Sequence, residues 1–270
     1  MFALAAAGSA LALLFLRWIS PIAQAELRDQ AVKASFAAAV FAVAKLIGRA
    51  WFLTGGSVTE ANNPAILSAL LEGPIGSALA LRLAGLGLIL VLLFPWRILR
   101  PVAAIGAGMV CYSFSIDGHA AAGPEILAAL FTLHLLTISF WIGGLRPLHT
   151  MPLWDVAEAG MAAEEFGRKA VLAVGVLILS GGAMLYVLSG GDPAALGTLW
   201  GRVLVLKLGA VALILALAAM NKLILTRGLL KGRREAGRRL RRSIRMEFRL
   251  MLVVFALTAI LTSIASPDGG

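Results

Sequence analysis

The sequence predicts an all-α polytopic membrane protein, a bundle of about eight transmembrane helices in a single domain covering residues 1–270. Three observations support this fold class. Hydrophobic residues make up 60% of the 270 residues, far above the proportion in soluble globular domains. Charged residues make up only 14% and gather in short clusters between apolar runs. Most of these runs are about twenty residues long, the length that an α-helix needs to cross a bilayer.

Eight apolar runs qualify as spanning segments. They cover residues 2–20, 34–54, 75–95, 99–116, 125–146, 168–189, 199–222 and 247–265. The first run resembles a secretory signal peptide, but its first arginine, Arg17, follows the apolar residues. We therefore interpret this run as a retained first helix. Acidic and apolar residues alternate after Pro152, which predicts a short helix lying at the membrane interface between segments five and six.

The basic residues divide the connecting loops into two sets. Residues 222–245 are rich in Arg and Lys, whereas residues 54–74, 117–124 and 189–199 have none. By the positive-inside rule, both termini lie outside and the loop of residues 222–245 is cytoplasmic. Topology thus explains the net charge of +10. The basic loop has almost no interleaved aromatic residues, so we expect contact with anionic lipid there and no nucleic-acid partner.

Two of the three histidines lie in one stretch, residues 117–147. His119 is in a polar turn that the charge pattern places outside, and His134 is within the apolar run, about 12 Å deeper at 1.5 Å per residue. An ionisable side chain at membrane depth is costly and indicates function. Imidazole binds copper, zinc, iron and nickel, so the pair is a candidate metal or haem site. The alternative is a solvated His119 and a His134 that hydrogen-bonds within the bundle.

Two sulfur-containing side chains in the fourth segment are further candidate ligands. Cys111 is the only cysteine, and Met109 precedes it by two residues. Soft sulfur suits Cu(I), although buried free cysteine is also common as packing. Residues two apart on a helix point about 200° from each other, so these two cannot face one site. A lone cysteine also excludes an intramolecular disulfide and a CxxC motif.

Three further features concern charge and packing within the segments. Lys45 lies near mid-membrane, and no helix offers it an obvious acidic partner, so we find no physical account of it in the sequence. Arg82 lies near enough to the outer boundary for its side chain to reach the headgroups. The glycine pairs at residues 143–144 and 181–182 predict close approaches between helices.

Four motifs carry a family resemblance. GHA at 118–120 and LHLLTISFWIGGLRPL at 133–148 resemble the copper resistance protein D (CopD) family of membrane proteins. FGRKA at 166–170, before SGG, agrees with this pattern. LWGRVLVLKL at 199–208 also agrees, with tryptophan where the family has tyrosine, and continues to AAMNK at 218–222. RMEF at 245–248 opens a closing helix that ends in Ser-Pro. The resemblance covers about residues 110–267 and is weaker over 1–109.

The resemblance implies a multi-pass protein of the cell inner membrane that handles copper, as Cu(I) or Cu(II), in import or copper resistance. It implies a transporter component and not an enzyme. Among the residues, it favours His119 and His134 as metal ligands, with Cys111 or Met109 as a third. The lipid bilayer and a periplasmic copper-binding protein are the implied partners. The Met-rich and His-rich outer segments that a copper collector would show are absent.

Two alternatives stay open. LHLLTISFWIGGL at 133–145 also looks like the histidine helix of the membrane-bound protoporphyrinogen oxidase family. That similarity would imply a haem- or porphyrin-binding redox enzyme with His134 as the haem ligand. The second alternative is a copper-delivery factor for oxidase assembly. Three histidines cannot supply two bis-histidine haem sites, which disfavours a diheme cytochrome.

Overall fold

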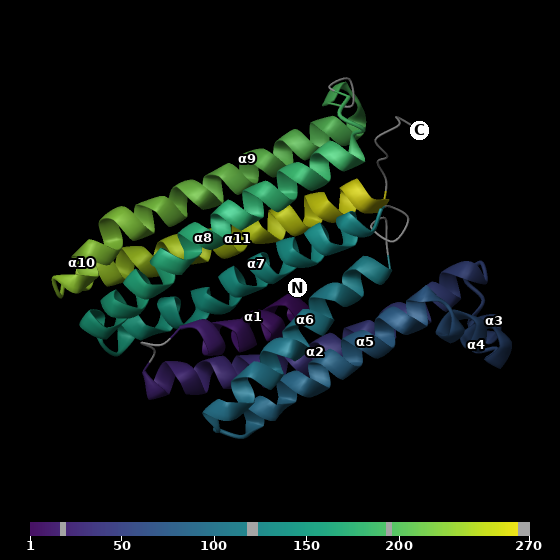
Figure 1. The fold of residues 1–270 in the computed structure, drawn as a ribbon, viewed down its shortest axis with the longest axis horizontal. Coiled ribbons are helices and arrows are strands. Elements are labelled where there is room, and N and C mark those ends of the chain that lie inside the picture. The colour runs from purple at the N-terminus through teal and green to yellow at the C-terminus, as the bar shows by residue number, and fades with distance from the viewer. Residues whose placement is uncertain (17–19, 118–123, 193–195, 264–270) are drawn as a thin grey trace. The chain divides into compact units, whose positions relative to one another are not determined.

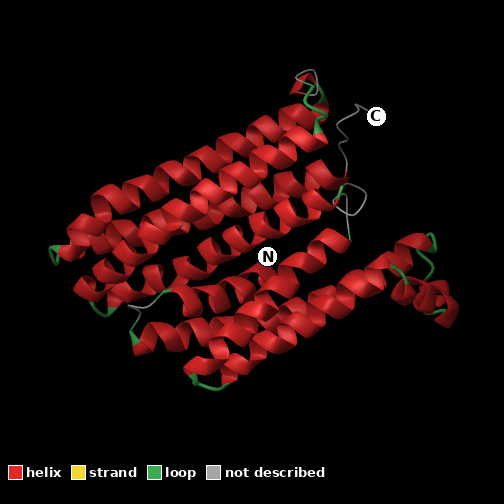
Figure 2. Cartoon of the chain, in the orientation of Figure 1, coloured by secondary structure: helices red, strands yellow, loops and turns green. Residues whose placement is uncertain are grey.

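The computed structural model describes residues 1–16, 20–117, 124–192 and 196–263. Throughout these ranges the chain is helix, turn or loop, and no strand occurs (Figure 2). The α-helices are α1 (Phe2–Phe15), α2 (Pro21–Leu53), α3 (Val58–Ala61), α4 (Pro64–Glu72), α5 (Pro74–Ile89), α6 (Arg100–Ile116), α7 (Glu125–Thr150), α8 (Val156–Leu188), α9 (Leu199–Met220), α10 (Thr226–Leu230) and α11 (Arg234–Ser263). Short 3₁₀ turns are η1 (Leu90–Leu93), η2 (Arg97–Leu99) and η4 (Met151–Leu153), and η6 (Asn221–Leu225) is a π-helix.

The chain is an all-α multi-pass membrane protein, as its composition predicts. Six helical stretches of the described residues are long and apolar enough to cross a membrane. They are Pro21–Leu53, Pro74–Leu93, Arg97–Ile116, Glu125–Leu153, Val156–Leu188 and Leu199–Leu230. The first predicted segment falls on α1, a shorter apolar helix, and the last begins within α11. The count of eight spans and the outer location of both termini stay predictions.

Helix α8 corrects one prediction about a connecting loop. It runs without a break from Val156 to Leu188, so the separate interfacial helix predicted after Pro152 is wrong. Asp155 caps the helix, and its Oδ1 accepts hydrogen bonds from the backbone N–H groups of Ala157 and Glu158. A capped start with no proline after it lets the polar first turns continue directly into the apolar part.

Residues 222–245 are also mostly helical, and not the loop that their charge predicts. Only a short turn separates α10 from α11, with Gly232 at a φ of 71°. Buried Ala236, Leu240 and Ile244 recur every four residues along the first half of α11. This spacing places them on one face of the helix, and the arginines occupy the remaining faces. The basic segment is therefore an amphipathic helix.

The chain divides into two compact units, residues 1–17 with 24–144 and residues 18–23 with 145–270. In the first unit, α5 and α6 lie side by side (Figure 1). They meet through two glycines: a Cβ added to Gly106 would lie 2.5 Å from Gly85 O, and one added to Gly85 would lie 2.7 Å from Gly106 O. Small residues permit such close backbone approach between membrane helices.

A second glycine contact joins α1 to α7 in the first unit. A Cβ added to Gly8 would collide with Ser139 O, and one added to Gly143 would collide with the backbone of Gly8. The predicted close approach at Gly143 is thus confirmed. The matching prediction for the glycine pair at residues 181–182 is wrong at Gly182, because no atom lies within 4 Å of a Cβ added there.

The second unit contains α8, α9, η6, α10 and α11. Helices α9 and α11 pack against each other (Figure 1), and Trp200, Val203, Leu204 and Leu261 form a buried apolar cluster between them. Helix α10 packs against α8, where a Cβ added to Gly160 would lie 2.9 Å from Leu230 N. The helical segment that follows α9, η6 with α10, is thereby held between α8 and α11.

Candidate functional site

His134 lies on α7 and is half-buried. It falls within Glu125–Leu153, a stretch long and apolar enough to cross a membrane. The position inside a spanning helix therefore agrees with the sequence analysis. The role of His134 as a metal ligand stays a prediction.

Cys111 is fully buried on α6 and contacts α7 through Ser139. Its Sγ lies 3.7 Å from Ser139 Oγ, a distance that permits a hydrogen bond between thiol and hydroxyl. Ser139 follows His134 by five residues, about 7.5 Å along the axis of α7 and about 140° around it. Cys111 thus meets α7 at a different level and on a different face from His134.

Met109 faces a different helix from Cys111. A Cβ added to Gly85 on α5 would lie 3.0 Å from Met109 Cβ, whereas Cys111 contacts α7. The two sulfur-containing side chains diverge as their spacing on one helix predicts. Met109 and Cys111 therefore cannot serve as two ligands of one ion.

His119 lies outside the described residues, so its relation to His134 stays a prediction. Within the ranges that the structure describes, no group of three or more His, Cys, Asp or Glu side chains is placed to hold a metal ion. The candidate ligands of the first unit are thus spread along α6 and α7.

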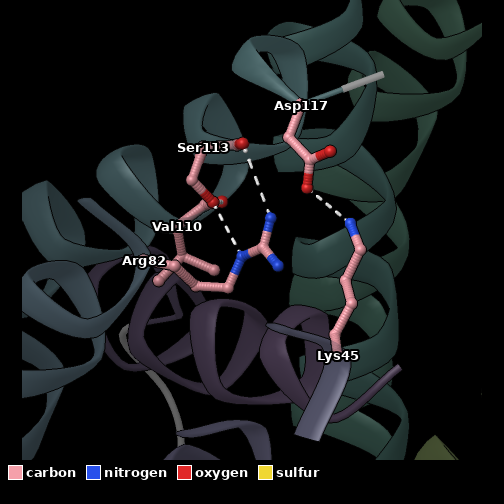
Figure 3. Close-up of polar contacts among 5 residues, drawn as sticks. All are labelled: Lys45, Arg82, Val110, Ser113 and Asp117. Carbon is pink, nitrogen blue, oxygen red and sulfur yellow. Dashed lines mark hydrogen bonds and ion pairs between the residues drawn. The ribbon is translucent and has the colours of Figure 1, made fainter. Parts of the chain in front are cut away.

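Arg82 on α5 is a buried polar residue, contrary to the prediction from its position in the segment. Its side chain is only 6% exposed, so the expectation that it reaches the headgroups is wrong. Its Nε donates to Ser113 Oγ at 3.0 Å, and its Nη2 donates to Ser113 O at 3.5 Å (Figure 3). Its Cζ lies 4.0 Å from the ring centroid of Phe114. Helix α6 thus offers both acceptors and an aromatic face to the guanidinium in the interior.

The hydroxyl of Ser113 both accepts and donates a hydrogen bond. It accepts from Arg82 Nε and donates to Val110 O at 2.7 Å (Figure 3). The residue is fully buried. It therefore orients the guanidinium, and its own proton is satisfied by the preceding turn of α6.

Lys45 on α2 forms an ion pair with Asp117, the residue that ends α6 (Figure 3). The spanning segments themselves contain no obvious acidic partner for Lys45. The partner instead stands just beyond one, at the start of the polar turn that contains His119. The sequence did contain a cue to this partner, because Asp117 is the first carboxylate after the fourth predicted segment.

The second unit holds another polar group, which was not among the predicted site residues. Asn221 Nδ2 donates to Glu247 Oε1 at 2.6 Å, and Glu247 is 1% exposed. Lys222, next to Asn221, donates from Nζ to Gly167 O at 2.9 Å. Asn221 and Glu247 belong to AAMNK and RMEF, two of the motifs that carry the family resemblance. A carboxylate so deeply buried is costly unless a hydrogen-bond partner such as Asn221 is present.

Comparison with known families gives two matches. A family model described as copper resistance protein D matches residues 160–261. A second model, described as the N-terminal domain of copper resistance protein D-like proteins, matches residues 1–129. Together they cover the chain except for residues 130–159 and 262–270. The second match extends the similarity through the helices where the sequence resemblance was weaker.

One curated relative has a recorded copper function. The copper transport protein CutJ of Bacillus subtilis (strain 168) is 29% identical over 160 residues, which cover 57% of this chain and 28% of CutJ. The match therefore spans little more than a quarter of that relative's length. No solved structure matches the chain.

Proposed function

Because the chain belongs to the copper resistance protein D family, we propose that it moves copper ions across the cell inner membrane, as an import or copper-resistance component. The two family matches and the similarity to a copper transport protein support this proposal. Copper is the cargo in this role. The chain acts as a transporter component and not as an enzyme.

The observation that carries the proposal is the half-buried imidazole of His134 on the membrane-competent helix α7. Imidazole is a ligand for copper, and an ionisable side chain at membrane depth is costly, which supports a functional role for His134. His119 would receive the ion at the outer mouth, from a periplasmic copper-binding protein. His134 would take it within the bundle.

The spread of the ligands suits a cargo better than a resident metal. No cluster of three His, Cys, Asp or Glu ligands occurs in the described ranges. A copper ion would therefore meet few protein ligands at each position along its path. Conduction requires binding strong enough for entry and weak enough for release. Cys111 is fully buried and contacts Ser139 on α7, so its sulfur would reach Cu(I) only through local opening of the packing. Met109 faces α5, so its thioether would bind copper only at a site separate from Cys111.

The test is copper accumulation in cells that produce the full chain. We expect His134→Ala and His119→Ala each to lower accumulation about tenfold or more, the usual cost of losing a group that supports metal binding. His149→Ala is the matched control, since His149 is a half-buried histidine on the same helix α7. Unchanged accumulation in His134→Ala, at normal membrane levels of the protein, would overturn its assignment as a ligand.

A Soret measurement separates this role from the haem-binding alternative. We expect the purified chain to lack a Soret band after production with ample haem. A band that His134→Ala removes would replace the copper proposal by the redox enzyme. Production in cells without the target oxidase then separates transport from copper delivery, because transport into the cell needs no oxidase.

A further inference from the structure

A second polar centre lies in the second unit, between η6 and α11. Asn221 Nδ2 donates to Glu247 Oε1 at 2.6 Å, and Glu247 is almost fully buried. The other atom of the same amide, Asn221 Oδ1, is buried and has no hydrogen-bond partner in the described part of the chain. Ser243, one turn before Glu247 on α11, is 5% exposed, and its Oγ likewise lacks a partner there. Buried polar atoms left without a hydrogen-bond partner are uncommon and need an explanation.

A local change in helix type positions the amide. Asn221 begins the π-helix η6, which interrupts an otherwise α-helical stretch between α9 and α10. Thr226 Oγ1 donates to Asn221 O at 2.9 Å, five residues back, and so closes the widened turn. Lys222 is drawn to Gly167 O on α8, so the bulge presents Asn221, and not the lysine, to Glu247. Such π-bulges occur frequently at functional sites.

The side-chain amide of Asn221 can hydrogen-bond both the ionised and the protonated form of the Glu247 carboxyl group. An ionised Glu247 accepts from Asn221 Nδ2, as the structure shows. A protonated Glu247 carries an O–H donor, and rotation of the amide by 180° would offer it Oδ1, the atom now without a partner. The neutral form is also far less costly to bury than the carboxylate. We propose that Glu247 and Asn221 form a proton-binding site.

The surrounding charges belong to the elements that pack against α11. Glu165 and Lys169 on α8 pair with each other at 2.6 Å, and Lys222 bonds Gly167 O. The end of α7 also lies against α11, since His149 O accepts a hydrogen bond from Arg241 Nε. The remaining charged or titratable groups on these elements are Arg146, His149, Glu158, Glu164, Arg168, Tyr186, Arg202, Lys207 and Arg227. On α11 itself, Arg245 and Arg249 flank Glu247 and are exposed. Protonation of Glu247 would thus change the charge balance of a region rich in cations.

The proposed site consists of residues of the second unit only, so it stands independently of copper. One consequence rests on the proposed function: if the chain transports copper, a buried proton site supplies a means to couple that movement to a proton gradient. Buried carboxyl groups serve this purpose in membrane pumps and transporters.

The direct test is pH-difference infrared spectroscopy of the purified full chain in lipid nanodiscs. We expect acidification to produce the carbonyl-stretch band of a buried protonated carboxyl group. Glu247→Gln should remove this band, and Asn221→Leu should shift its position, because the carbonyl environment changes. Glu165→Gln, a buried carboxyl paired with Lys169, and Glu235→Gln, an exposed one paired with Arg239, are the controls that should keep it.

Two outcomes would overturn the proton site. One is an identical spectrum for the wild type and Glu247→Gln between about pH 4 and pH 9, a range that covers ordinary and strongly displaced carboxyl titration. Glu247 would then be a permanently ionised structural group. The other is a spectral change that follows sodium concentration and not pH, which would make the centre a metal-cation site. Loss of copper uptake in His134→Ala at every pH, with an intact band, would separate the two proposals.

Discussion

Lys45 Nζ on α2 lies 2.5 Å from Asp117 Oδ2 at the end of α6, although the two residues are 72 positions apart in the sequence. Asp117 also acts electrostatically on Arg82, which hydrogen-bonds Ser113 on the same helix α6. The Lys45–Asp117 pair joins α2 to the end of α6. Arg82 on α5 joins the same helix through Ser113.

The strength of the Lys45–Asp117 pair can be measured with a double-mutant cycle. Lys45→Met and Asp117→Asn should each lower the free energy of unfolding, and their coupling should be about 1 kcal/mol or less, because the lysine side chain is 56% exposed. Unfolding in detergent micelles provides the measurement. The more exposed Lys33–Asp29 pair should show a smaller coupling and serves as the control. A coupling of zero for Lys45–Asp117 would show that the contact contributes nothing to stability.

Removal of the Ser113 hydroxyl should destabilise the first unit. Ser113→Ala leaves Arg82 Nε without its acceptor, and an unsatisfied buried donor costs about 1–3 kcal/mol. Ser77→Ala, which removes an exposed hydroxyl that donates to O of Gly73, the residue before α5, should change little. Thermal unfolding of the two variants side by side gives the comparison. Equal melting temperatures would mean that Arg82 finds another acceptor at no cost.

The two glycine pairs of the sequence analysis should respond oppositely to a methyl group. Gly143→Ala would press a Cβ into the backbone of Gly8, and overpacking of this kind costs about 1–3 kcal/mol. Gly182→Ala meets no atom within 4 Å and should be neutral or stabilising by up to about 1 kcal/mol, since alanine favours the helix. The fraction of monodisperse protein after heating measures both. Tolerance of alanine at Gly143 would contradict the α1–α7 contact.

The Cys111 thiol should resist modification in the folded protein. Cys111 is fully buried between α6 and α7, so reagent access requires local opening of the packing. We expect maleimide labelling at least about tenfold slower in the native chain than in the unfolded chain. As the only cysteine, it needs no background correction. Rapid native labelling would show a route from solvent to the thiol, which a copper path through Cys111 would provide.

The predicted topology can be tested by single cysteines in a Cys111→Ala background. Glu235→Cys at the start of α11 should react with an impermeant reagent only from the cytoplasmic side, and Glu72→Cys at the end of α4 only from the outside. Both positions are exposed. Labelling of intact cells and of inverted vesicles distinguishes the sides. The opposite result would reverse the orientation inferred from the basic residues.

The apolar runs predicted α5, α6 and α7 closely, because hydropathy reports directly on length and burial in a bilayer. Hydropathy failed at the start of α2, which begins at Pro21 and not near residue 34, at α8 and at the start of α11, where each helix continues through polar residues. An apolar run ends at the first charged residues, but the backbone hydrogen bonds of the helix continue through them. Asp155 and the buried face of Ala236, Leu240 and Ile244 were the local signals for the longer α8 and α11.

The candidate site was predictable only in part. The divergence of Met109 and Cys111 follows from the geometry of one helix, and the structure bears it out. Arg82 was misplaced because its acceptor, Ser113, lies on another helix 31 residues away. Burial of a charge depends on whether a neighbouring helix offers a partner, and spacing along one helix carries no information about that.

The sequence by itself determined the all-α membrane class, the family resemblance and the direction of each side chain around its own helix. These properties depend on composition and on the fixed geometry of an α-helix. Only the tertiary structure decided that Lys45 meets Asp117, that Arg82 meets Ser113 and that Asn221 meets Glu247. These partners lie on different helices. Small residues allow such helices to approach closely, as Gly85 and Gly106 do for α5 and α6. Which helices become neighbours is a property of their complementary surfaces, and it decides which buried polar groups find a partner.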